Sequence, residues 1–218
     1  PDWLDLKAPI LPRMLQSAGY ATAHFGKWHL ANNMIPDSPV PGEYGYDEYG
    51  AFNCAGEQMP VHEDSEHTIA FIEKSQAAGK PFFVNLWLHE PHTPFHTVPK
   101  YRWRFRDLPE EDNIYASVLS HADDRIGEVL DTLDRLGLTD NTLVVFSSDN
   151  GPARAAGKSE LGLMHDTATG AGYNLAASKG VTGGRKGYKS SLFEGGIGVP
   201  FIARWPGKIA ADAIDDSS

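Results

Sequence analysis

Cysteine, long apolar runs and positive charge are what this sequence has least of. Its 218 residues contain one cysteine, Cys54, so an internal disulfide framework is excluded. No apolar stretch approaches the roughly 20 residues that a membrane-spanning helix needs, and no signal peptide is visible. The formal net charge of -10 disfavours a nucleic-acid binder, because phosphate contacts require clustered Lys and Arg. What remains is the ordinary composition of a globular protein, 41% hydrophobic and 22% charged.

Helix-like and strand-like segments alternate along the chain. Apolar spacing, a proline that fits only a first turn and glycine stops predict helices over residues 9–18, 65–78 and 114–136. Alternating or continuous apolar runs predict strands over residues 20–25, 81–88, 142–148 and 199–205. Continuous runs such as 81–88 and 142–148 are typical of strands covered on both faces. The pattern predicts an α/β fold with a mostly parallel sheet flanked by helices.

Two stretches show no clear periodicity. Residues 32–60 carry many Pro, Gly and Asn, which predicts irregular surface structure. Residues 151–187 are rich in Gly, Ala and Ser, and we interpret them as a long functional loop, since structureless loops of that length are rarely neutral.

Chemically capable side chains follow or precede the predicted strands. In open α/β sheets, ligands bind beyond the carboxyl ends of the strands, so these positions predict a site. They are, in chain order, Lys27 and His29, His89 and His92, Asp149 and Asn150, and Lys189.

Asp149 and Asn150 offer oxygen ligands of the kind that calcium or magnesium prefers. Asp-Asn-Gly is also a common turn-forming sequence, and from these residues alone the turn is the favoured interpretation.

Lys27 and Lys189 can bind a doubly charged oxyanion such as sulfate or phosphate, because each is a compact positive charge. An anion between Lys27 and His29 also explains why two basic side chains lie so close in sequence. The alternative is a pair of ordinary exposed lysines.

His92 is a candidate general acid, since a histidine near neutral pH can give a proton to a leaving oxygen. Pro91 and Pro94 limit the backbone around it. For either His89 or His92 taken alone a structural role is the favoured interpretation, and His92 is the better functional candidate of the two.

Together these pieces resemble the formylglycine-dependent sulfatases of the alkaline phosphatase superfamily. The resemblance is carried by GYATAHFGKWHL (19–30), GYDEYG (45–50), PFFVNLWLHEPHTPF (81–95), NTLVVFSSDNGP (141–152) and KSSLFEGGIGVPFIARWPG (189–207). They occur in the family's order over nearly the whole chain. The resemblance implies an alkaline-phosphatase-like sulfatase domain.

The resemblance also implies roles for individual residues. Lys27 matches a lysine that steadies the nucleophile and the sulfate, and Lys189 matches the second sulfate-binding lysine. His29 matches the histidine that acts on the formylglycine hydroxyl, and His92 matches the proton donor to the leaving oxygen. Asp149 and Asn150 match two ligands of a divalent cation, usually Ca²⁺.

The family's first signature, Cys or Ser followed by x-Pro-x-Arg, is missing. Cys54 stands in NCAGEQ and is not a candidate nucleophile. The strand with two further metal-binding aspartates is missing too. We therefore expect residues 1–218 to be part of one sulfatase catalytic domain, incomplete at both ends, without its nucleophile segment and inactive alone.

Two other functions stay open. One is a phosphodiesterase or phosphonate monoester hydrolase of the same superfamily, and the other is a non-catalytic carbohydrate-binding relative. The resemblance implies a sulfated small molecule or carbohydrate as partner, neither nucleic acid nor a membrane segment, and export to periplasm, lysosome or exterior. The oligomeric state is left open.

Overall fold

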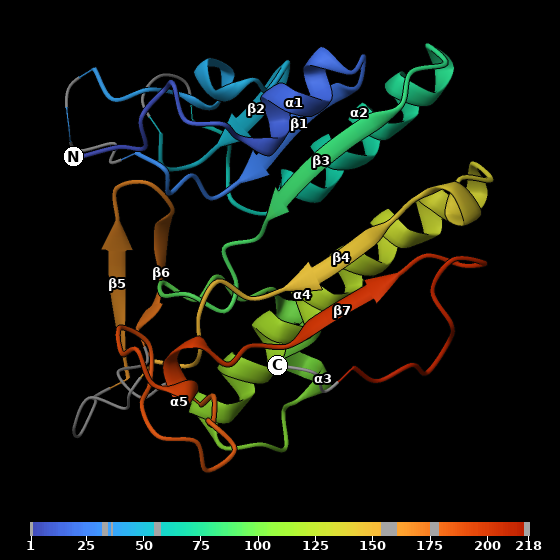
Figure 1. Ribbon diagram of the computed structural model, residues 1–218. Coiled ribbons are helices and arrows are strands. Elements are labelled where there is room, and N and C mark those ends of the chain that lie inside the picture. The colour runs from blue at the N-terminus through green and yellow to red at the C-terminus, as the bar shows by residue number, and fades with distance from the viewer. Residues whose placement is uncertain are drawn as a thin grey trace.

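A computed structural model describes residues 2–31, 35, 37–54, 58–153, 161–174 and 179–215. Its strands form one three-stranded sheet and two two-stranded sheets. Helix α2 (Asp64–Ala77) lies behind the three-stranded sheet, and α4 (Glu110–Arg135) lies behind the pair of β4 (Val144–Ser147) and β7 (Phe201–Arg204) (Figure 1). None of the helices in the described ranges is long and apolar enough to cross a membrane.

The first sheet is parallel and has the strand order β2-β1-β3. β1 (Ala21–Gly26) lies between β2 (Glu48–Ala51) and β3 (Phe82–Trp87) and pairs in parallel with both. Its central position explains why five of its six residues are buried. α1 (Leu11–Ser17) precedes β1, and Pro12 lies in its first turn as the sequence predicts.

β2 corrects the prediction that residues 32–60 are irregular surface structure. The 3-10 helix η1 (Pro41–Tyr44) and β2 lie in this stretch, and Tyr44, Tyr46 and Phe52 are among its buried side chains. These aromatic side chains bury enough apolar area to hold the segment against the core. The many Pro and Gly residues around them interrupt the apolar pattern on which the prediction depends. Residues 32–34, 36 and 55–57 of this stretch lie outside the described residues.

The two long helices agree with the predicted ones. α2 (Asp64–Ala77) packs against β1, β3 and α4 (Glu110–Arg135). α4 begins four residues before the predicted start at 114, since the three acidic residues of its first turn suit the positive end of the helix dipole. Ile114, Val118 and Leu133 lie on its buried face.

β4 (Val144–Ser147) and β7 (Phe201–Arg204) form a separate antiparallel pair. The prediction that 142–148 is a buried strand is wrong: Val145 is 51% exposed and Phe146 44%. The reason is that β7 is the only strand that pairs with β4 among the described residues. Among the described strands, parallel pairing is confined to the β2-β1-β3 sheet, whereas the β4-β7 pair and the pair of β5 (Gly162–Asp166) and β6 (Gly170–Asn174) are antiparallel.

The region 151–187 is not a structureless loop throughout. β5 (Gly162–Asp166) and β6 (Gly170–Asn174) form a hairpin there, and Tyr173 bridges to Phe95. Residues 154–160 and 175–178 lie outside the described part of the chain. α3 (Pro99–Arg104), the 3-10 helix η2 (Thr139–Asn141) and the short α5 (Glu194–Ile197) complete the fold. The sheet and flanking helices confirm the predicted α/β class.

Candidate active site

The carboxyl ends of β1, β3 and β4 point toward the same side of the molecule (Figure 1). Lys27 and His29 follow β1, His92 follows β3, and Asp149 and Asn150 follow β4. Lys189 precedes α5, and its backbone N–H donates to the Pro152 carbonyl shortly after β4. The fold therefore gathers side chains that are more than 150 residues apart in sequence.

Gly26 ends β1 in a conformation that other residues adopt only with strain. Its φ is +110°, and a Cβ there would overlap the carbonyl oxygen of Trp87. The next residue, Lys27, donates its backbone N–H to the same carbonyl at 2.8 Å. The glycine thus allows the chain to leave the sheet while Lys27 stays fixed to β3.

The buried Trp28 fixes the backbone between Lys27 and His29. Trp28 is 1% exposed, and its backbone is held by Asn53, whose side chain receives a hydrogen bond from the Trp28 N–H and donates one to the Trp28 carbonyl, both at 2.6 Å. The indole thus anchors the segment, while Lys27 is half-buried and His29 is exposed. Asn53 has a positioning role that the sequence analysis missed.

The charges of the site act on one another. Burial lowers the pKa of the Lys27 ammonium, Lys189 lowers it further, and Asp149 partly opposes them. Burial and then Lys27 lower the pKa of His29, with Lys189 acting in the same direction. Four of the six predicted site residues, Lys27, His29, Asp149 and Lys189, therefore lie close enough to act on one another's charge.

His92 belongs to this group as well. Burial lowers its pKa, its hydrogen bond to the Thr93 carbonyl raises it, and Lys189 and Lys27 lower it. Its Nδ1 donates to the Thr93 carbonyl oxygen at 2.6 Å. The proton on Nδ1 is thereby engaged, and Nε2 is the nitrogen left to exchange a proton.

Asp149 and Asn150 follow β4 in a turn that contacts α5. Gly151 donates its N–H to the Gly196 carbonyl at 2.9 Å, and Lys189 donates its own to the Pro152 carbonyl at 2.9 Å. Asn150 Nδ2 donates to the Gly151 carbonyl at 2.8 Å, so its side-chain oxygen remains as an acceptor. The exposed carboxylate and this amide oxygen fit a hard divalent cation as two of its ligands.

The predictions for Cys54 and His89 concern residues outside this group. Cys54 is 3% exposed, and burial raises the pKa of its thiol, which suits a packing residue. His89 is buried and donates from Nε2 to the Pro94 carbonyl at 3.0 Å, which agrees with the favoured structural interpretation.

Comparisons with known proteins identify the family of the chain. The family model described as Sulfatase matches residues 4–217. The chain is 26% identical to "Uncharacterized sulfatase YdeN" of Escherichia coli (strain K12), over 95% of this chain and 40% of that protein. It is 28% identical to the N-acetylgalactosamine-6-sulfatase of Mus musculus, over 94% of this chain and 41% of that protein.

The fold is also similar to solved structures. The structure of Ps i-CgsB in complex with k-i-k-neocarrahexaose superposes with a TM-score of 0.70 at 22% identity, over 90% of this chain and 47% of that one. The chain therefore spans less than half the length of the relatives that it matches.

Proposed function

The chain belongs to the sulfatase family, and on that premise we propose that the protein hydrolyses sulfate esters. The proposal rests on the proximity of Lys27 and Lys189, which are far apart in sequence. Each of them acts electrostatically on His29 and His92, and Asp149 acts on the same groups. Residues 1–218 are proposed to be part of one catalytic domain.

Lys27 and Lys189 bind the sulfate group. Their mutual repulsion is one cause of the lowered pKa of Lys27, and an anion placed between them removes that cost. In the transition state, negative charge on the non-bridging oxygens strengthens both contacts, which is how fixed positive charge lowers a barrier.

His92 supplies the proton that the leaving alkoxide or phenoxide needs. Its Nδ1 is held by the Thr93 carbonyl, so the proton is delivered from Nε2. His29, beside Lys27, acts on the hydroxyl of the nucleophile. The nucleophile is proposed to be a formylglycine outside these 218 residues.

Asp149 and Asn150 would hold the divalent cation, of the calcium class. When bound, the cation contributes positive charge against the sulfate oxygens. The substrate is proposed to be a sulfated carbohydrate or aryl sulfate, and the name of the N-acetylgalactosamine-6-sulfatase relative supports the carbohydrate.

The test uses the full-length protein that contains this chain, assayed with an aryl sulfate and the matching aryl phosphate. Lys27→Met and Lys189→Met are expected to lower kcat/KM for the sulfate ester by about 10²-fold or more, as loss of one transition-state contact does. Lys74→Met is the matched control, since Lys74 lies on α2 and pairs with Glu48 at the surface.

Preference for the phosphate ester would support the phosphodiesterase or phosphonate hydrolase alternative. Binding of a sulfated sugar without any turnover would support the non-catalytic relative. The 218-residue chain alone is expected to show no hydrolysis, because its nucleophile is proposed to lie elsewhere.

A further inference from the structure

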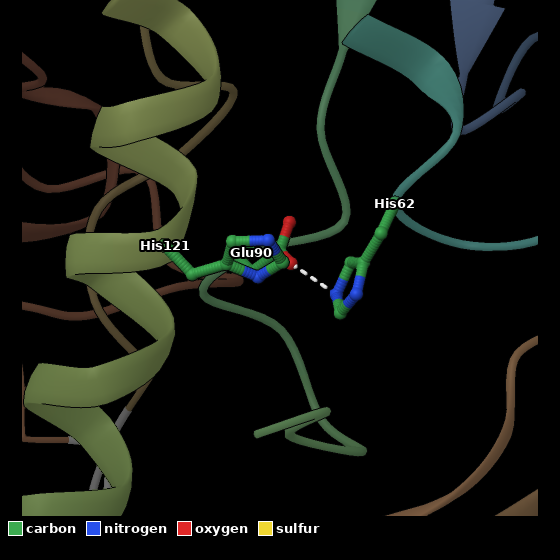
Figure 2. A group of neighbouring side chains, drawn as sticks. All are labelled: His62, Glu90 and His121. Atoms are coloured by element: carbon green, nitrogen blue, oxygen red, sulfur yellow. Dashed lines mark ion pairs between the residues drawn. The ribbon is translucent and has the colours of Figure 1, made fainter. Parts of the chain in front are cut away.

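Three side chains from distant parts of the sequence meet behind the loop that carries His92. His62 precedes α2, Glu90 follows β3 and His121 lies on α4 (Figure 2). One potential metal-binding atom of each residue lies within 4.8 Å of those of the other two. None of the three belongs to the sulfate site described above.

One nitrogen of this cluster is buried without a partner. His121 Nδ1 has no hydrogen-bond partner among the described residues. His62 Nε2 and Glu90 Oε1 are buried too, and they contact each other at 2.7 Å as an ion pair. Buried polar atoms are normally satisfied, so the unpartnered imidazole nitrogen beside this pair indicates a ligand shared by the three residues.

Neighbouring groups hold the ligand atoms in place. The other carboxylate oxygen of Glu90, Oε2, receives a hydrogen bond from Arg125 at 2.7 Å, and Arg125 also binds Asp64 at 2.7 Å. The ring of Tyr101 packs 5.0 Å from that of His121. Such outer contacts orient metal ligands in known metal centres.

We propose that His62, Glu90 and His121 form a binding site for a first-row transition-metal ion of the zinc class. Imidazole nitrogens select zinc-class ions over calcium, and two histidines with one carboxylate are a recurrent zinc ligand set. The site is separate from the oxygen ligands Asp149 and Asn150.

The geometry requires movements of about 1 Å. Zinc–nitrogen bonds of about 2.1 Å in a tetrahedral arrangement place two ligands of one ion about 3.4 Å apart. The widest pair in the cluster, within 4.8 Å, therefore closes by up to about 1.4 Å, and the 2.7 Å contact opens by about 0.7 Å. A bound ion would join three separate segments and fix Glu90, two residues before His92.

The experiment uses full-length protein prepared without a histidine tag, stripped with EDTA and dialysed against Zn²⁺ in excess Ca²⁺, which occupies the oxygen site. Mass-spectrometric metal analysis is expected to find about one zinc per chain. Zinc is expected to raise Tm by about 2 °C or more, because it binds the folded state. Co²⁺ in place of zinc is expected to give the visible absorption of a nitrogen-ligated ion.

His62→Gln and His121→Gln are expected to lose the zinc, the Tm shift and the cobalt spectrum. His67→Gln is the matched control, since His67 lies on α2 with its side chain 50% exposed, and it is expected to keep all three. The proposal is overturned if wild-type protein retains no zinc, a result that does not depend on how the variants fold. It is equally overturned if His121→Gln binds as much zinc as wild type. Neither readout requires sulfate hydrolysis.

Discussion

His24 Nε2 lies 2.9 Å from the backbone carbonyl oxygen of Lys27 and donates a hydrogen bond to it. On the other side of the ring, Nδ1 accepts a hydrogen bond from Asn85 Nδ2 at 3.0 Å. The neutral ring therefore links β1, β3 and the segment that carries Lys27. His24 is fully buried, so both of its nitrogens depend on these two partners.

Replacing His24 with Phe keeps the ring volume and removes both hydrogen bonds. The Lys27 carbonyl and the Asn85 amide then lose a partner, which is expected to cost about 1–3 kcal/mol of unfolding free energy. Urea denaturation measures this cost. A variant as stable as wild type would show that these two contacts contribute nothing.

The burial of His24 also makes the stability of the protein depend on pH. Burial lowers the pKa of His24 from 6.5 to about 4, so the unfolded chain binds the proton more readily than the folded one. The stabilisation is complete above pH 6.5 and is lost progressively as the pH falls to 4, by about 3 kcal/mol in total. Urea denaturation at pH 7.5 and pH 4.5 should show a steeper loss for wild type than for His24→Phe. Equal losses would contradict the prediction.

Gly151→Ala is expected to reduce activity through the turn that carries Asp149. A Cβ at position 151 would overlap the Gly195 carbonyl oxygen, so the turn must separate from α5. We expect kcat/KM of the full-length protein to fall by about 10-fold or more, as misplacement of a site by about 1 Å does. Steady-state kinetics on an aryl sulfate measure it.

Gly127→Ala is the control for that substitution. Gly127 lies inside α4 with open space at its Cβ position, so alanine is expected to stabilise the helix by about 0.5–1 kcal/mol and leave turnover unchanged. Equal activity of the two alanine variants would argue against the role of the Gly151 contact.

Arg125→Met is expected to destabilise the protein by about 3–5 kcal/mol, because it leaves two buried carboxylates without their cation. Arg125 is 5% exposed at its side chain and contacts Asp64 and Glu90, both at 2.7 Å. Arg135→Met on the same helix removes an exposed pair with Glu73, for which about 1 kcal/mol or less is expected. Chemical denaturation measures the free energy of unfolding of both variants. Similar losses would show that the buried network contributes no more than the surface pair.

Much of the fold follows from local pattern. The helices 11–17, 64–77 and 110–135 lie within a few residues of their predicted places, because apolar spacing and glycine stops act over short distances. β2 was missed because it pairs with β1, more than 20 residues away in sequence. The β5–β6 hairpin was missed because its short strands lack a strong apolar period of their own. The exposure of β4 was missed because burial depends on which strands flank it.

The sequence by itself determined the residue types of the site and their order, since Lys27, His29, His92, Asp149 and Lys189 each stand at a predicted strand end or beside one. Only the tertiary structure decided that the two lysines share one space and that His24 and Asn53 hold the Lys27 segment. It alone also brought His62, Glu90 and His121 together. The physical reason is the same throughout. Hydrogen bonds and ion pairs act over a few ångströms, and sequence spacing does not tell which segments 30 or more residues apart come into contact when the chain folds.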